Sequence, residues 1–441
     1  MIRRMATNPI PQFPAGFLWG VSTSAHQIEG AAGEREPSVW DAFTAEPGRV
    51  KDDSTAAVAC DHYHRYPEDV ALLADLGVDA YRFSVSWPRV NSPGGLDFYD
   101  RLVDELCAAG VRPVPTLFHW DLPLALDWLD RDTAARFAEY AARVAERLGD
   151  RVTKWITLNE PAEHTLLGHA LGAHAPGKQL LFDALPVAHH QLLAHGLAVR
   201  ALRAAGVTDI GIANSHGPTW PASQESADLE AAAFYDILLN RLFSDPLLLG
   251  RYPEGIGELM PGDSAGLDSD LKVIAEPIDW YGINYYAPTK VGAPQGAEIE
   301  FGGLTLPAEL PFTVREIEGH PVTDFGWPVV PEALTELLTG FRARFGDRLP
   351  PIVITENGCS YEGIDDQERI AYLDGHVRAL HRAVEAGVDV RGYFVWSLLD
   401  NFEWAEGYER RFGLVHVDYD TLERTPKASY GWLRDILRAR R

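Results

Sequence analysis

The stretch AERLGDRVTKWITLNEP, residues 145–161, carries the pattern from which the fold is predicted. Its first part reads as the end of an amphipathic helix, and Gly149 is the residue type that most easily takes the left-handed conformation past a helix end. The next part, KWITL, is largely apolar, as expected of a parallel strand buried on both faces. The chain then brings Asn159 and Glu160 to the end of this strand. Pro161 stops the strand because it has no N–H to donate.

The same order of helix, glycine and apolar strand recurs along the chain. Further examples are ALLADLGVDAYRFSV, DELCAAGVRPVPTLF, RALRAAGVTDIGIAN and AVEAGVDVRGYFVW. Eight candidate strands result, at residues 17–23, 79–85, 112–119, 154–160, 209–215, 279–286, 351–358 and 391–398. Eight strands alternating with helices predict a single (β/α)8 TIM barrel with its active site at the C-terminal ends of the strands. A doubly wound open sheet is the alternative, but no glycine-rich phosphate loop follows the first strand.

Helical patterns fill the gaps between the strands, for example at 96–110, 133–149 and 331–346. No linker or low-complexity segment interrupts this alternation, so one catalytic domain is predicted over residues 1–441, with about residues 1–12 as a flexible N-terminus. Residues 287–330 show little helical pattern. They are predicted to form a long irregular loop over the active face of the barrel.

The composition narrows the classes of function. Lys and Arg number 39 against 64 Asp and Glu, a formal net charge of −25, which disfavours nucleic acid and membrane surfaces as partners. No stretch approaches the ~18 apolar residues of a transmembrane helix, and no apolar run follows the N-terminal arginines as in a secretory signal. Three scattered cysteines indicate neither a disulfide framework nor a thiolate zinc site, which favours a cytoplasmic protein. The sequence leaves open whether the protein is a monomer or a homo-oligomer.

Polar and aromatic side chains gather at the predicted C-terminal ends of the strands. They are Gln27, Arg82, His119, Trp120, Asn159, Glu160, Asn284, Tyr286, Glu356, Trp396, Glu403 and Trp404. Because these strand ends meet around the mouth of a barrel, the side chains are predicted to surround one pocket. A lone tryptophan in an α/β core more often packs than binds a ligand. Three tryptophans beside carboxylates instead favour a binding role, in which their indole rings stack on the C–H faces of a sugar.

Glu160 and Glu356 stand out because each ends an apolar strand, on nearly opposite sides of the predicted ring. Glutamate is rarely buried without a partner, so these positions argue for a function rather than for simple solvation. Glycoside hydrolysis requires two carboxylates on either side of the scissile bond, one protonated and one ionised. Their surroundings must therefore push their pKa values apart. Arg82 is predicted to keep Glu356 ionised, and a negative charge across the pocket is predicted to keep Glu160 protonated.

These residues and their flanking motifs resemble glycoside hydrolase family one, the β-glucosidase-like retaining enzymes. The resemblance lies in TLNEP and ITENG, with HWDLP (119–123) and WSLLDNFEW (396–404). Four further motifs occur in the order expected of the family: FLWGVSTSAHQIEG (17–30), YRFSVSWPR (81–89), GINYY (282–286) and RRFGLVHVDY (410–419). The resemblance therefore spans nearly the whole chain. The resemblance implies a retaining exo-β-glycosidase acting on small unphosphorylated β-D-glycosides, most often a β-glucosidase, with β-galactosidase and β-fucosidase activity also expected. It implies no metal and no organic cofactor.

On the matching positions, the resemblance implies that Glu160 is the acid/base and Glu356 the nucleophile that forms a glycosyl-enzyme. Asn159 would bind the 2-hydroxyl of the sugar, a contact that strengthens in the transition state. Three residues would hold and tune the nucleophile, namely Arg82, Asn284 and Tyr286, and the last two are also expected to bind the substrate. The remaining residues would stack on the sugar or bind its outer hydroxyls: Trp396 as the floor, Trp120, and Gln27, His119, Glu403 and Trp404.

The chain also departs from the family pattern. His26 stands where the family usually has Tyr, and residues 162–164 are AEH where many members have a Trp after NEP. The segments around 46–56 and 88–100 are shorter than usual. These differences concern the outer, leaving-group side of the site. The carboxylate of Glu403 argues against 6-phosphorylated sugars, because members acting on those replace it with residues that accept phosphate.

Two other functions fit the same residues. A transglycosidase would use both glutamates but pass the sugar to an acceptor other than water. A non-catalytic sugar-binding barrel is disfavoured because such descendants usually lose a catalytic carboxylate, and here both are present. The histidine-rich stretches 62–64 and 188–195 are interpreted as structural, since they do not share a close metal-binding spacing with a carboxylate.

Overall fold

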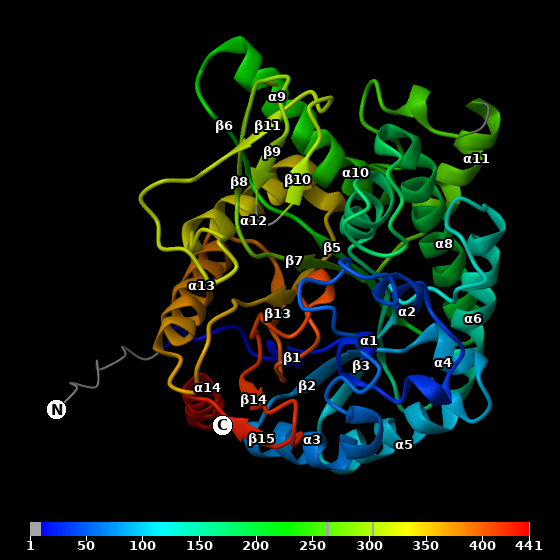
Figure 1. Cartoon of the computed structure of the whole chain (residues 1–441), viewed down its shortest axis with the longest axis vertical. Coiled ribbons are helices and arrows are strands. Elements are labelled where there is room, and N and C mark those ends of the chain that lie inside the picture. The colour runs from blue at the N-terminus through cyan, green and yellow to red at the C-terminus, as the bar shows by residue number, and fades with distance from the viewer. Residues whose placement is uncertain (1–9, 262–263, 302–303, 441) are drawn as a thin grey trace.

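Eight parallel strands form a closed barrel in the computed structural model, which describes residues 10–261, 264–301 and 304–440 (Figure 1). The barrel strands are β1 (Leu18–Ser22), β2 (Ala80–Ser84), β3 (Arg112–Phe118), β4 (Lys154–Asn159), β5 (Asp209–Ser215), β7 (Trp280–Asn284), β12 (Ile352–Asn357) and β13 (Val390–Trp396). Their order around the ring is β1-β13-β12-β7-β5-β4-β3-β2, and β1 closes the ring by pairing with both β13 and β2. Each lies in one of the predicted strand segments to within a residue, and the predicted TIM barrel is confirmed.

The inside of the barrel explains the nearly continuous apolar runs in the sequence. Each strand contributes one buried side chain to a shared interior layer: Leu18, Ala80, Val114, Ile156, Ala213, Trp280, Val353 and Phe394. A second, larger core lies between the strands and the surrounding helices. Because both faces of the strands are covered, apolar residues are needed at successive positions rather than at alternate ones.

Helices form the outer layer around the barrel, as Figure 1 shows. The longer ones are α3 (His62–Leu76), α5 (Gly95–Ala108), α6 (Asp132–Leu148), α8 (Leu185–Ala204), α11 (Ser264–Ile274), α12 (Pro331–Phe345), α13 (Gln367–Glu385) and α14 (Ala428–Ala439). In α6 the buried residues Phe137, Ala141, Val144 and Leu148 recur at three- and four-residue spacing, so they form one apolar stripe that packs on the barrel.

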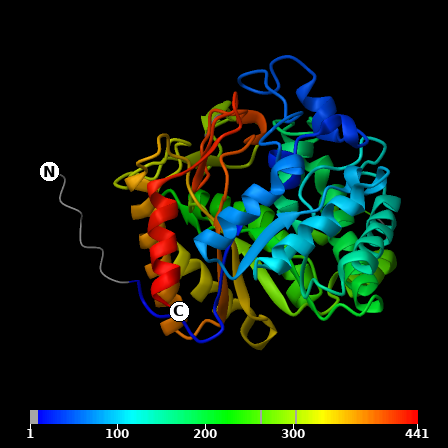
Figure 2. The same ribbon diagram turned by 90° about the horizontal axis from the view of Figure 1, so that it is seen from below.

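Long connections on one side of the barrel carry shorter elements. Their helices are α1 (Ala25–Ile28), α2 (Val39–Thr44), α4 (Trp87–Asn91), α7 (Pro161–Glu163), α9 (Ser226–Asp236) and α10 (Leu242–Leu249), and two π-helical turns span His164–Ala170 and Ile237–Arg241. After β13, strands β14 (Val415–Val417) and β15 (Arg424–Pro426) pair before the last helix. Figure 2 shows the connection that follows β1, in blue, rising above the barrel.

Residues 287–330 are not the irregular loop that the sequence predicted. Their described part holds no helix, but it contains the short strands β8 (Thr289–Gly292), β9 (Ile299–Phe301), β10 (Leu304–Leu306) and β11 (Thr313–Arg315). Strand β9 pairs with β10, and β8 pairs with β11 and with β6 (Thr219–Pro221), which follows β5. Runs of three or four residues are too short to show a strand period, and the β6 partner lies in another connection, so the sequence pattern missed them.

The flexible N-terminus predicted at about residues 1–12 falls mostly on residues 1–9, which lie outside the described residues. Phe13 packs against Phe17 and Trp19, with ring centroids 4.3 Å and 5.4 Å away. Across the described part of the chain, no helix is long and apolar enough to cross a membrane. All three cysteines are free thiols.

Candidate active site

Glu160 reaches the mouth of the barrel through a left-handed turn at the end of β4. Its φ of +46° and ψ of +60° are rarely adopted by non-glycine residues, and Pro161 begins α7 immediately afterwards. The backbone N–H of Glu160 donates to the carbonyl of Ala213 on β5 at 2.7 Å, which ties the turn to the neighbouring strand. Strand β4 therefore ends at Asn159, one residue before the predicted end at Glu160, and the Glu160 side chain lines a cavity.

The surroundings of Glu160 favour its protonated form. Burial raises the pKa of this carboxyl well above its usual range, and the negative charges of Glu356 and Glu163 raise it further. The amide Nδ2 of Asn284 donates to Glu160 Oε1 at 2.8 Å and opposes this shift, but to a smaller extent. The predicted negative charge across the pocket is thus present, although burial is the larger cause.

Glu356 ends β12 in the opposite kind of environment. Arg82 Nη1 donates to its Oε1 at 2.5 Å, and the hydroxyl of Tyr286 donates to its Oε2 at 2.6 Å. A buried guanidinium and a phenol, one on each oxygen, stabilise the ionised carboxylate. Arg82 therefore lies beside Glu356, as the sequence predicted.

One buried hydrogen-bond network connects the two glutamates. Arg82 Nη2 donates to Asn159 Oδ1 at 2.6 Å, and the Asn159 amide donates to Nε2 of His119 at 3.0 Å. Burial, with a smaller contribution from Arg82, holds the pKa of His119 well below its usual range, so the ring is neutral. Since Nε2 accepts, Nδ1 of His119 carries the proton, and it has no partner among the described residues. The network fixes both side chains and leaves a donor for a ligand.

Asn284 lies at the site but contacts a different glutamate from the one expected. The family resemblance implied that it would hold the nucleophile, whereas its amide donates to Glu160 at 2.8 Å and to Asn159 at 3.0 Å. The cause is its carboxamide oxygen, which accepts a hydrogen bond from the Thr355 hydroxyl at 2.6 Å. That bond turns Nδ2 toward β4 rather than toward Glu356.

Gln27 and Glu403 come from the connections after β1 and β13 and contact each other. Gln27 Nε2 lies 3.2 Å from Glu403 Oε2 and also donates to Asn401 Oδ1 at 3.0 Å and to the Phe402 carbonyl at 2.9 Å. Burial, followed by the charge of Glu356, raises the pKa of Glu403 to about 8. A carboxyl group that is largely protonated at neutral pH both donates and accepts hydrogen bonds, which suits sugar hydroxyls.

Three tryptophans line the same cavity as the glutamates: Trp120, Trp396 and Trp404. The centroid of the His119 ring lies 5.7 Å from that of Trp396, with the rings stacked, and Trp120 packs against Trp404 at 4.7 Å. His26, at the position where the family usually has Tyr, stacks on Trp404 with ring planes 1° apart. Its imidazole therefore supports a wall of the cavity from behind.

A cavity of about 630 Å³ joins these groups. The predicted site residues that line it are His119, Trp120, Glu160, Tyr286, Glu356, Trp396, Glu403 and Trp404. The others are fully buried and reach the cavity through the hydrogen bonds described above: Gln27, Arg82, Asn159 and Asn284. The structure therefore brings every predicted site residue to one place.

The rest of the cavity wall was not predicted as a site. Glu163, noted in the sequence only as a departure from the family, lines the cavity three residues after Glu160. The only sequence signal was its closeness to Glu160, because the chain turns at Glu160 and begins α7 at Pro161. The wall also includes residues of both π-helical turns and of the segment 287–330, whose separate short elements gave no common sequence pattern.

The histidine-rich stretches make protein contacts away from this network. His189 Nε2 lies 2.9 Å from Asp270, and His195 Nδ1 lies 2.6 Å from the Thr157 hydroxyl. Within residues 10–261, 264–301 and 304–440, no group of three or more His, Cys, Asp or Glu side chains is arranged to hold a metal ion.

Comparison with known proteins places this chain among the glycosidases. The sequence profile of glycosyl hydrolase family 1 matches residues 10–441. β-Glucosidase A of Acetivibrio thermocellus is 42% identical, with 97% of this chain and 98% of the relative aligned. A bifunctional β-D-glucosidase/β-D-fucosidase of Bifidobacterium breve is 42% identical, over 96% and 98%.

The structure of the Thermotoga maritima β-glucosidase in complex with deoxynojirimycin superposes with a TM-score of 0.89 and 40% identity. The superposition covers 97% of this chain and 98% of that one. The family profile, the relatives and the barrel fold agree. The chain belongs to glycosyl hydrolase family 1.

Proposed function

We propose that the chain is a retaining exo-β-glycosidase that hydrolyses terminal, unphosphorylated β-D-glucosides. One observation carries this proposal: two buried glutamates line one cavity in opposite environments, Glu160 favouring its acid form and Glu356 held as an anion by Arg82 and Tyr286. This is the division of labour that glycoside hydrolysis requires. The chain acts as one catalytic unit, and residues 287–330 contribute part of the cavity wall.

In the first step the ionised Glu356 attacks the anomeric carbon of the sugar. The bond between that carbon and the glycosidic oxygen breaks, and Glu160 gives its proton to the departing oxygen. The product is a glycosyl-enzyme with an ester bond to Glu356 and a free alcohol. Neutralising Glu356 also lowers the pKa of Glu160, since the charge of Glu356 helped to raise it.

In the second step Glu160, now ionised, takes a proton from a water molecule that attacks the anomeric carbon. The ester bond to Glu356 breaks, the sugar leaves with its original β configuration, and both carboxyls return to their starting states. The two carboxyl groups are expected about 5–5.5 Å apart, the separation typical of retaining glycosidases.

The sugar is proposed to lie against Trp396, with Asn159 on its 2-hydroxyl. Its outer hydroxyls are bound by the unpartnered donor of His119 and by the Gln27–Glu403 pair. The B. breve relative named for both β-glucosidase and β-fucosidase activity supports a tolerant site, and we propose β-galactosides and β-fucosides as further substrates.

The test is the configuration of the first product. Purified protein hydrolyses 4-nitrophenyl β-D-glucoside in an NMR tube, and the anomeric proton signals are followed before mutarotation. β-Glucose is expected first. If α-glucose appears first, the enzyme inverts and the nucleophile role of Glu356 is wrong. If no glucose forms, the alternative of a non-catalytic sugar-binding barrel is favoured.

A further inference from the structure

The two glutamate strands divide the barrel ring into unequal parts. Going round the ring, β12 and β4 are separated on one side by β13, β1, β2 and β3, and on the other by β7 and β5. The predicted sugar contacts follow strands of the first part, namely Gln27 after β1, His119 after β3, and Trp396 and Glu403 at or after β13. The cavity also extends past Glu160 over the second part, beyond Asn284 and Tyr286 at the end of β7.

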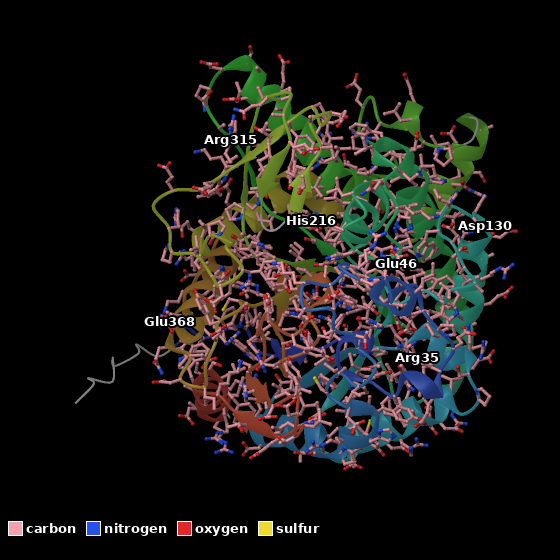
Figure 3. All side chains as sticks on the ribbon, viewed as in Figure 1. Arg35, Glu46, Asp130, His216, Arg315 and Glu368 are labelled. Atoms are coloured by element: carbon pink, nitrogen blue, oxygen red, sulfur yellow. The ribbon has the colours of Figure 1, made fainter. Side chains whose placement is uncertain are left out.

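This second part has an apolar lining, which we call the leaving-group chamber. It is lined by Leu166, Leu167, Leu238, Leu239, Leu310 and Phe312. The first four belong to the two π-helical turns that follow β4 and β5, and the last two to the segment 287–330. His216, labelled in Figure 3, follows β5 and lines the cavity as well. Leu310 and Phe312 belong to a small apolar cluster separate from the main core.

Two polar side chains that border the chamber, Thr165 and His216, are already paired within the protein. The Thr165 hydroxyl donates to the Pro161 carbonyl at 2.7 Å. Both ring nitrogens of His216 are bonded, Nδ1 to Asn240 Oδ1 at 3.0 Å and Nε2 to the Tyr281 hydroxyl at 2.8 Å. A second sugar brings several hydroxyls that need new partners, and burying hydroxyls without them is costly. These groups offer few such partners.

The position of the chamber identifies its occupant, given the function proposed above. Glu160 protonates the departing oxygen, so the leaving group must lie beside Glu160, and Ala162, Glu163 and Leu166 continue from it along the cavity wall. We propose that the leaving-group chamber selects β-glucosides whose leaving group is an alkyl or aryl group over those whose leaving group is a second sugar. Glu163 also lines this wall, and Ser215 is its hydrogen-bond partner.

An alkyl series separates binding from chemistry, because the alcohols from ethanol to pentanol differ little as leaving groups. For ethyl, propyl, butyl and pentyl β-D-glucoside, kcat/KM is expected to rise about two- to fourfold with each methylene that enters the chamber. Pentyl glucoside is expected to exceed cellobiose by about tenfold or more. A flat series, or faster cleavage of cellobiose, would overturn the proposal. Cleavage of these glucosides would leave the proposed function standing, while failure to cleave any β-glucoside would overturn both.

A double variant tests whether the chamber causes the rise of kcat/KM with alkyl length. Leu166 and Leu239 line the cavity, are half-buried and lie outside the packed apolar clusters, so replacing both with serine spares the core. The ratio of kcat/KM for pentyl over ethyl glucoside is expected to fall by about tenfold in Leu166→Ser/Leu239→Ser. Leu124→Ser removes an exposed leucine outside the cavity lining and is expected to keep the wild-type ratio. Equal ratios in both variants would place the selectivity elsewhere and contradict the proposal.

Discussion

The cavity of this enzyme has two unlike halves, and the strands that carry the glutamates separate them. In the polar half, Gln27, His119 and Glu403 follow β1, β3 and β13 and make buried hydrogen bonds, Gln27 with Glu403 and His119 with Asn159. The leaving-group chamber is lined mainly by leucine, from the two π-helical turns and the segment 287–330. A sugar presents the same hydroxyls in every substrate, so its contacts can be held rigidly by buried hydrogen bonds. Leaving groups vary, and the part that meets them is carried by elements that can change without disturbing the barrel.

The largest expected loss of activity comes from replacing Glu356, which lies between the two halves of the cavity. Glu356→Ala removes the proposed nucleophile and is expected to lower kcat on the order of 10⁴- to 10⁶-fold, as for other enzymes that lose a covalent nucleophile. The loss should be similar for aryl and alkyl glucosides, because the attack on the sugar precedes any difference between leaving groups. Steady-state kinetics on both substrate types measure it. A loss confined to one type would assign Glu356 to the leaving-group side.

The next effect should depend on the leaving group. Glu160→Ala removes the proposed acid and is expected to lower kcat/KM for alkyl glucosides about 10²- to 10⁴-fold. Dinitrophenyl glucosides need no proton on their departing oxygen, so their first step should be nearly unaffected. Pre-steady-state release of dinitrophenol reports that step directly. An equal loss on both substrates would remove Glu160 from the acid role.

A smaller and uniform effect is expected in the polar half. Gln27→Ala removes a side chain that contacts Glu403 and, by proposal, a sugar hydroxyl, and kcat/KM should fall about 10- to 100-fold. Because the contact is to the sugar, ethyl and pentyl glucosides should lose the same factor. If the loss grew with alkyl length, Gln27 would act on the leaving-group side and the division into two halves would fail.

The smallest effect concerns pH. The wild-type kcat/KM should follow a bell-shaped profile whose alkaline limb reports loss of the Glu160 proton. The negative charge of Glu163 helps to raise the pKa of Glu160, so Glu163→Gln should lower that pKa and move the alkaline limb to lower pH. At the optimum, kcat/KM should change by less than about tenfold. Glu385→Gln, exposed at the end of α13, serves as the control and should not move the limb. An unshifted limb in Glu163→Gln would exclude the coupling.

The two halves also differ in how far the sequence predicts them. Glu160 and Glu356 follow long apolar strands whose ends must meet at a barrel mouth, so the fold and the polar half follow from local patterns. Arg82 was predictable as well, because the ionised carboxylate requires a cation nearby. The orientation of Asn284 was not, since it depends on a hydrogen bond with Thr355 from a neighbouring strand. The leaving-group chamber was missed because its walls come from three separate short segments with no shared period.

The central claim is that Glu356 attacks the sugar from the side opposite the leaving group, and a rescue experiment tests it most directly. In Glu356→Gly the space left by the carboxylate admits azide, which replaces the nucleophile while Glu160 stays in place. With dinitrophenyl β-D-glucoside and azide, the predicted product is α-glucosyl azide, identified by its anomeric coupling constant in NMR. Formation of β-glucosyl azide would show that azide entered from the leaving-group side and would contradict the assignment of Glu356.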